Sequence, residues 1–180
     1  MAKLAEAYLH LKLVSVPDNV GELGDQVMRD AVKAASGVYQ FPVSVSVRLE
    51  EGSLKYWTSV VGRLCVAIAA YPTVKMGMVE LYKDAKIFGS IVSERMMVEV
   101  PPASVVYRIE RRTQDSGRIY RLHKRIDKID RSRSMLNASA VEAELRSIQD
   151  ELDRIVGGLS DEDAEFLIKN LSINAKQNAI

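Results

Sequence analysis

Apolar and polar residues alternate near the start of the chain, where Leu9, Leu11 and Leu13 are interleaved with polar side chains. A period of two predicts a strand with one buried face. The following stretch, PDNVGEL, predicts a helix that is capped by Asn19 and ends at Gly37. The N-terminal segment therefore predicts a strand followed by a helix.

Alternation returns in FPVSVSVRLEEGSLKYWTSVV, over residues 43–49 and again over residues 54–60, after a glycine turn. Two alternating runs joined by such a turn predict a β-hairpin. A short buried helix is then expected over residues 61–71, ended by Pro72, and a longer helix over residues 73–97.

Beyond the two prolines of VEVPPAS, nearly all of the chain is expected to be helical and highly charged. Apolar residues there recur every three or four positions in two narrow seams. The first seam contains Ile119, Leu122, Ile126 and Ile129, and the second contains Val141, Leu145, Ile148, Leu152 and Ile155. A capping box at Ser139 and Glu142 separates the seams, which predicts an antiparallel helical hairpin. Ser160 and Asp163 repeat the box and predict a further helix.

These elements predict the α+β class: a small antiparallel sheet built from a β-α-β-β unit, with packed helices, followed by a charged C-terminal helical hairpin. The expected division is an α+β domain over residues 1–100, a hairpin extension over residues 101–172 and a frayed tail over residues 173–180.

Composition limits the possible functions. Apolar residues make up 47% of the 180 residues, which is enough for a sizeable core, and the net charge is only +1. The single cysteine, Cys65, has no partner for a disulfide and no clustered histidines for a metal site. We therefore expect a cytoplasmic protein without a membrane span, cofactor, metal or catalytic residues.

Charge changes sign along the C-terminal part of the chain. Residues 101–134 carry ten basic and four acidic side chains, whereas residues 135–180 carry four basic and nine acidic ones. In an antiparallel hairpin the basic helix would lie beside the acidic one, so its charge would be largely offset by its neighbour.

Nucleic-acid binding by the basic helix, residues 118–133, is the alternative interpretation. The residues that would carry it are Arg118, Arg121, His123, Lys124 and Arg125. The spacing of Arg118 and His123 resembles the motif of HEPN-type ribonucleases, which implies that the Arg would stabilise phosphorane charge and the His would transfer a proton.

Aromatic residues suggest where a protein partner would bind. Tyr56 and Trp57 are adjacent in a predicted strand, so they point to opposite faces, and one of them should lie on the outer face of the hairpin. Phe166 would cover an end of the helical hairpin or meet another subunit, and Arg118 and Arg121 would bind an acidic partner.

The stretches VSVRLEEGSLKYWTSVVG and YPTVKMGMVELYKDAKIFG resemble small bacterial α+β proteins that accompany effectors in conflict and anti-phage systems. YRIERRTQDSGRIYRLHKRID is similar to the helical tail that such proteins sometimes carry, so that the resemblance covers about residues 43–130. It implies a non-catalytic interaction module, an accessory or adaptor that forms homo-oligomers or binds an effector protein. A phage or secretion-system structural component, in which charged hairpins pack between subunits, is a further alternative.

Overall fold

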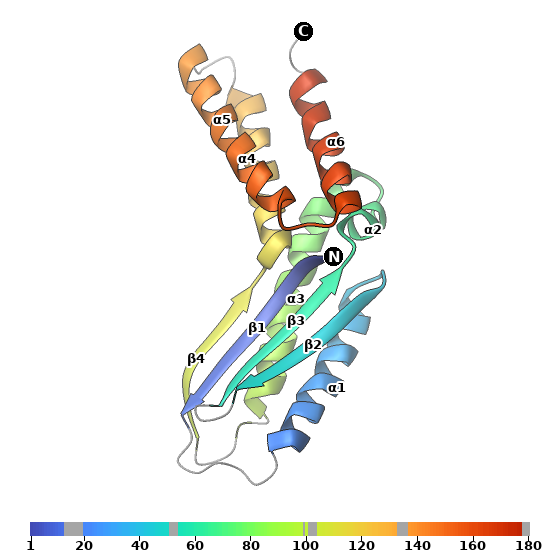
Figure 1. Ribbon diagram of the computed structural model, residues 1–180, viewed down its shortest axis with the longest axis vertical. Coiled ribbons are helices and arrows are strands. Elements are labelled where there is room, and N and C mark those ends of the chain that lie inside the picture. Colours follow the sequence, from blue (N-terminus) through green and yellow to red (C-terminus); the bar gives the residue numbers. More distant parts are fainter. Residues whose placement is uncertain (13–19, 51–53, 99, 101–103, 133–136, 178–180) are drawn as a thin grey trace.

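The computed structural model describes residues 1–12, 20–50, 54–98, 100, 104–132 and 137–177. Within these residues the chain forms four strands and six helices (Figure 1). Their bounds are β1 Ala2–Lys12, α1 Val20–Val38, β2 Val43–Glu50, β3 Lys55–Gly62, α2 Leu64–Ala69, α3 Val74–Val98, β4 Val105–Arg112, α4 Gln114–Ser132, α5 Ala138–Val156 and α6 Asp161–Gln177. The predicted features at Leu13, Asn19, Gly52 and the two prolines lie outside the described residues.

The four strands form one antiparallel sheet in the order β2-β3-β1-β4. With α1 and α3 as the main crossovers, this is the connectivity of a split β-α-β arrangement, with the short α2 added before α3. The α+β class is therefore as the sequence predicts.

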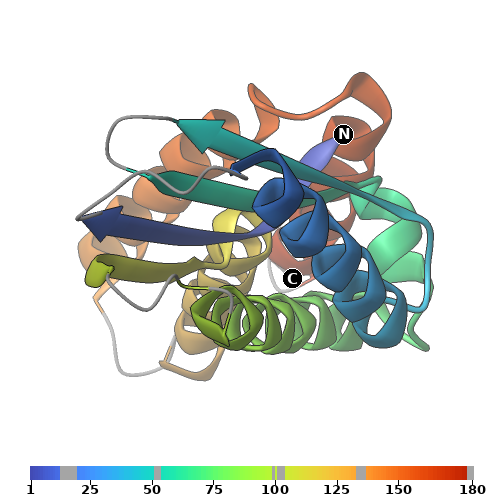
Figure 2. The same cartoon turned by 90° about the horizontal axis from the view of Figure 1, so that it is seen from below.

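The helices α1 and α3 pack against one face of the sheet, as Figure 2 shows. Among the described elements, no helix lies over the opposite face, which Figure 1 presents to the viewer. We call this opposite face the open face. It is bounded by α4 where β4 runs into that helix.

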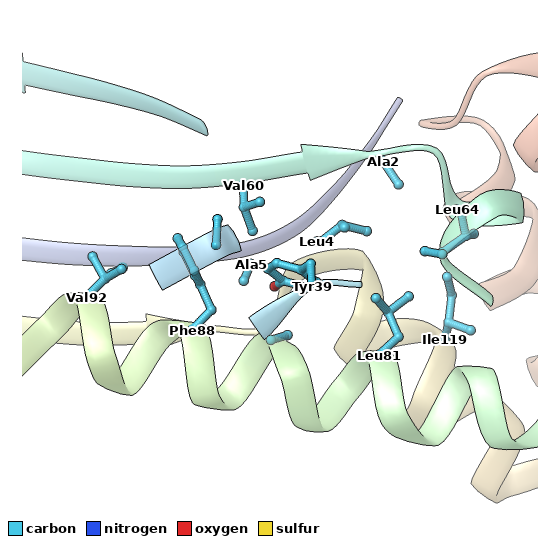
Figure 3. Packing of buried hydrophobic residues seen from close by; sticks show 14 of the residues in the cluster. Ala2, Leu4, Ala5, Tyr39, Val60, Leu64, Leu81, Phe88, Val92 and Ile119 are labelled. Atoms are coloured by element: carbon cyan, nitrogen blue, oxygen red, sulfur yellow. The ribbon is translucent and has the colours of Figure 1, made fainter. Parts of the chain in front are cut away.

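The core lies between the sheet and α3. The expected stripe on α3 is buried, and its members Leu81, Phe88 and Val92 point toward the strands in Figure 3. Leu64 of α2 and Ile119 of α4 extend the same cluster beyond the end of the sheet. Burial of each such side chain stabilises the fold by about 1.5–3 kcal/mol.

The strand β1 is more deeply buried than a strand with one buried face would be. Because it lies at the centre of the sheet, side chains on both of its faces are covered by neighbours. The prediction of a helix beginning at residue 61 was wrong at its start. Val60 and Val61 instead pair with β1 at the end of β3, and α2 begins at Leu64.

The expectation of helix after the two prolines was wrong for Val105–Arg112, which form β4. This strand pairs with β1 from Glu6 to Lys12 and gives the sheet its fourth strand. The physical reason is non-local: the free edge of β1 offers unpaired backbone groups that only another strand can satisfy.

The helical hairpin is present. The helices α4 and α5 pack together, and most of both apolar seams is buried, but Leu145 is 44% exposed whereas Leu152 is 5% exposed. Leu145 lies on the part of α5 that faces solvent. The N-terminal cap of α5 also differs from the prediction. The cap is Asn137 rather than Ser139, and its side chain accepts a hydrogen bond of 2.7 Å from the Ala140 amide.

The helix α6 continues to Gln177, so the segment that was expected to fray from residue 173 is helical as far as that residue. In the second predicted capping box the Ser160 hydroxyl donates to the Asp163 carboxylate over 3.1 Å. The other Asp163 oxygen accepts the Cys65 amide over 2.9 Å. Asp163 therefore caps the start of α2 rather than its own helix.

No helix in the described residues is both long enough and apolar enough to cross a membrane.

Candidate functional site

A row of four aromatic rings crosses the open face of the sheet. It runs from Trp57 on β3 through Tyr8 and His10 on β1 to Tyr107 on β4. Successive ring centroids are 5.1, 6.4 and 5.0 Å apart. We call these four residues the ring row.

The strand register creates the ring row. Tyr8 and Trp57 are direct partners across β1 and β3, and His10 lies two residues further along the same face. An irregularity in the β1–β4 pairing between His10 and Leu11 allows Tyr107, next to His10's partner Arg108, to reach the His10 ring.

Two guanidinium groups lie over the rings. The Arg48 guanidinium is 4.1 Å from the centroid of Trp57, its direct partner across β2 and β3. The Arg112 guanidinium is 5.4 Å from the centroid of Tyr8. Each guanidinium is attracted to the π-face of the ring that it covers.

A buried carboxylate lies beneath these groups. Glu6 is only 3% exposed although it belongs to the open face. It accepts hydrogen bonds from the side chains of Lys3, Ser59, Arg112 and Gln114, and the last two are 2.8 and 3.3 Å away. Burial alone would raise the pKa of Glu6, but the bonds and charges of Lys3 and Arg112 outweigh it and hold that pKa below its ordinary value.

A hollow of about 440 Å³ opens above Glu6. Its lining carries three cations, Lys3, Arg48 and Arg112, against the single carboxylate of Glu6. Polar side chains that can donate and accept hydrogen bonds complete the lining, and Trp57 forms an aromatic wall. The remaining lining residues are Ser46, Ser59, Val61 and Gln114.

Gln114 is held in a strained conformation at the rim of this hollow. Its φ of 42° lies in the left-handed region, which a residue with a Cβ adopts at an energetic cost. The side chain reaches Glu6 from the first residue of α4. This connects the hollow to α4, which carries six of the 25 Lys and Arg residues.

The β4 edge of the sheet carries exposed apolar side chains. Val105 is 61% exposed, Tyr107 is 72% exposed and Ile109 is 39% exposed. The opposite edge is different, because the apolar residues of β2, such as Val45 and Val47, pack against the core beside α1. We call the β4 edge the apolar edge because it exposes more apolar side chains than the β2 edge, although Arg108, Arg111 and Arg112 are also exposed on it.

The predicted partner-binding residues fall in different places. Trp57 lies on the open face, but Tyr56 is buried on the opposite side of β3, so it cannot serve as an accessible anchor. Arg118 and Arg121 are exposed on α4. Phe166 is partly buried against the core.

Within the described part of the hairpin, the direct ion pairs between α4 and α5 are made by Arg125, and Lys128 acts on Glu144 at longer range. Arg125 donates to Glu144 over 2.9 Å, to Glu151 over 2.7 Å and to Ser147 over 2.9 Å. Arg121 and Lys124 remain exposed to solvent. The apolar seams hold the hairpin together, Arg125 makes its direct cross-helix ion pairs, and Arg121 and Lys124 have no ion pair with the described residues of α5.

His123 and Arg118 are not brought together. His123 is buried, lies 3.7 Å from Asp127 and shares a hollow of about 390 Å³ with Lys75 and Asn170. Burial lowers the pKa of His123. Arg118 lines no part of this hollow and instead faces Asp115 over 3.6 Å.

Sequence reasoning did not find Tyr8, Tyr107, Arg48 or Arg112 as site residues. The available signal was the alternation that places Tyr8 and His10 on the same face of a strand. The missed strand β4 concealed the other half of the site, since Tyr107 and Arg112 reach the open face only through its pairing with β1.

No three His, Cys, Asp or Glu side chains of the described residues gather in a way that could hold a metal ion. No protein-family model matches the chain, and neither the curated proteins nor the solved structures include a significant match.

Proposed function

We propose that this protein is a non-catalytic assembly module that pairs with a second copy of itself through the β4 edge. The observation that carries the proposal is the apolar, exposed edge formed by Val105, Tyr107 and Ile109. An edge strand presents unpaired backbone groups, and another strand is their natural partner. The resemblance to accessory proteins of bacterial conflict systems supports a role for the pair as an adaptor that binds an effector.

The charges of β4 favour one register. Antiparallel pairing of two copies centred on Ile109 places Arg108 opposite Glu110 of the second copy, and the reverse. Within one chain Arg108 already forms an ion pair with Glu110. Opposite charges would therefore face each other on both sides of the twofold axis, which favours this register over registers that are shifted along the strand.

The two edges of the sheet also limit the assembly. Pairing through β4 uses the apolar edge of both copies and leaves the β2 edges outermost. The outward side chains of β2 are Ser44, Ser46, Arg48 and Glu50, all of which are exposed. Because a twofold pair occupies the β4 edge of both copies, no β4 edge is left for a third copy, and the assembly stops at two copies.

Light scattering after size-exclusion chromatography at micromolar concentration tests the proposal, and we expect a dimer. Ile109→Lys places two like charges face to face at the twofold axis and should raise the dimer Kd roughly tenfold or more. Ser44→Lys is the matched control, since it adds the same charge to the β2 edge.

A charge exchange tests the register. Arg108→Glu alone should weaken the dimer, and Arg108→Glu combined with Glu110→Arg should restore it, because opposite charges again face each other. Thermal unfolding of each variant shows whether the monomer is intact. A monomer at every concentration, or a dimer that is indifferent to Ile109→Lys, would refute the proposal.

A further inference from the structure

We infer that the open face binds a single-stranded nucleic acid, with bases on the ring row and phosphates on Arg48, Arg112 and Lys3. This site lies on the face of the sheet and shares only Tyr107 with the β4 edge, and its centre lies on the strands rather than on the basic helix α4. The inference therefore goes beyond the proposed pairing. It rests on the geometry of the rings and on the charge of the hollow.

Three rings of the ring row supply stacking platforms on three strands: Trp57 and His10 are partly exposed and Tyr107 is largely exposed, whereas the Tyr8 ring between Trp57 and His10 is buried. Every nucleobase has a flat π-face, so a line of aromatic rings on an uncovered sheet can hold successive bases of a strand without reading a particular sequence. Tyr107, at the end of the row, is largely exposed, so one end of the row is open to a ligand.

Trp57 is the platform that forms a wall of the hollow. Its ring face is now occupied by the Arg48 guanidinium at 4.1 Å. A base that stacks on Trp57 would take the place of this guanidinium, or lie between it and the ring. In either case Arg48 keeps a planar contact or gains a phosphate, so entry of the base replaces one favourable contact with another.

The charge of the hollow is complementary to a polyanion. Three cations line it against one carboxylate, and Glu6 is buried with its oxygens already bonded to Lys3, Ser59, Arg112 and Gln114. A phosphate would therefore meet the guanidinium and ammonium groups first. The whole chain has a net charge of only +1, so the attraction is local to this face.

The cationic track continues onto α4. Arg118 follows Gln114 by four residues and Arg121 follows Arg118 by three, so they share a helix face with a residue of the hollow's rim. Both are exposed. A strand that leaves the hollow past Gln114 would meet these two arginines next.

The chain contains a single tryptophan, so Trp57 reports directly on its own surroundings. We expect labelled oligo(U) or oligo(dT) of roughly 12 nucleotides to quench Trp57 fluorescence and to gain anisotropy on binding. The two oligonucleotides distinguish RNA from DNA as the ligand, and binding of either supports the inference. A duplex should bind more weakly, because its bases are already stacked and paired. Three phosphate contacts predict a slope of about −2 for log K against log salt concentration.

Variants locate the site. Trp57→Ala should weaken binding about tenfold to a hundredfold, and Trp57→Phe should retain most of the affinity because it keeps an aromatic platform. Arg48→Ala should weaken binding severalfold and reduce the salt slope by about one phosphate contact. Arg146→Ala removes an exposed arginine from α5 and is the matched control.

Each other outcome overturns the inference. Absence of binding at low salt removes it, and so does binding that is lost in Arg121→Ala but unchanged in Trp57→Ala and Arg48→Ala. If Trp57 fluorescence changes with protein concentration in the absence of an oligonucleotide, the open face is a contact between protein molecules and not a nucleic-acid site. Ile109→Lys should still bind the oligonucleotides, since each copy holds a complete ring row, so this test is independent of the pairing test.

Discussion

Glu6 shows how one residue sets the chemistry of the open face. Its cross-strand partners are Ser59 on β3 and Arg112 on β4, and both donate hydrogen bonds to its carboxylate. A buried carboxylate is stable only when such bonds replace its lost water. Glu6 therefore fixes Arg112 beside the Tyr8 ring, where the guanidinium contributes to the cationic face.

The depressed pKa of Glu6 predicts a pH dependence of stability. The folded-state pKa lies below the unfolded value of about 4.3, so the stabilising contribution is present above pH ~4.3 and is lost as the pH falls through the folded pKa. Glu6→Gln should cost about 1–3 kcal/mol at neutral pH, because buried donors lose their charged acceptor.

Urea unfolding of wild type and Glu6→Gln at neutral and acidic pH measures this effect. The difference in free energy of unfolding should shrink as the pH falls below about 4. A difference that stays constant or grows in acid would show that the carboxylate is not stabilised by its partners.

At the scale of elements, Asp163 joins two helices that are far apart in sequence. Burial would raise the pKa of Asp163, but backbone bonds from Cys65 and Leu64 hold it below its ordinary value. The residue before α2, Arg63, provides no side-chain cap of its own. The carboxylate of α6 thus satisfies amides at the start of α2, which fastens the C-terminal helix to the sheet domain.

Asp163→Ala should therefore lower the free energy of unfolding by about 1–3 kcal/mol and increase hydrogen exchange at the Cys65 amide. Glu162→Ala is the control, since Glu162 lies in the same turn and forms an exposed ion pair with Arg63. We expect that control to cost no more than about 1 kcal/mol. Equal effects of the two changes in thermal unfolding would contradict the capping role.

The helical hairpin supplies a second matched pair of variants, one at a buried leucine and one at an exposed leucine. Leu152→Ala should cost about 2–5 kcal/mol, because Leu152 is buried where α5 meets the core. Leu145→Ala should change stability by less than about 0.5 kcal/mol, because Leu145 is largely exposed. Urea unfolding separates the two, and a large effect of Leu145→Ala would indicate that another surface covers α5.

Elements with a regular period could be predicted from the sequence. The strands β2 and β3, the stripe of α3 and the two seams of the hairpin all repeat at the spacing their secondary structure requires. The strand β4 could not be recognised in this way. Its three arginines and single glutamate obscure the pattern, and its partner β1 lies about a hundred residues earlier in the chain.

At the scale of the whole molecule, the candidate site depends on register rather than on any local motif. Trp57 could be proposed from the hairpin alone, because one of two adjacent aromatics must face outward. The ring row could not, since Trp57, Tyr8 and Tyr107 come from three strands that meet only in the folded sheet. The cations of the hollow are gathered from distant segments in the same way.

The ring row ends at the free edge of the sheet, and this position has a geometric consequence. Two copies joined there by a twofold axis normal to the sheet would set their rows end to end, with opposite sense. A polynucleotide has a chemical direction, whereas a twofold pair has none. One strand therefore cannot make the same contacts on both halves, and the pair would accept either two strands of opposite polarity or a single strand that folds back on itself.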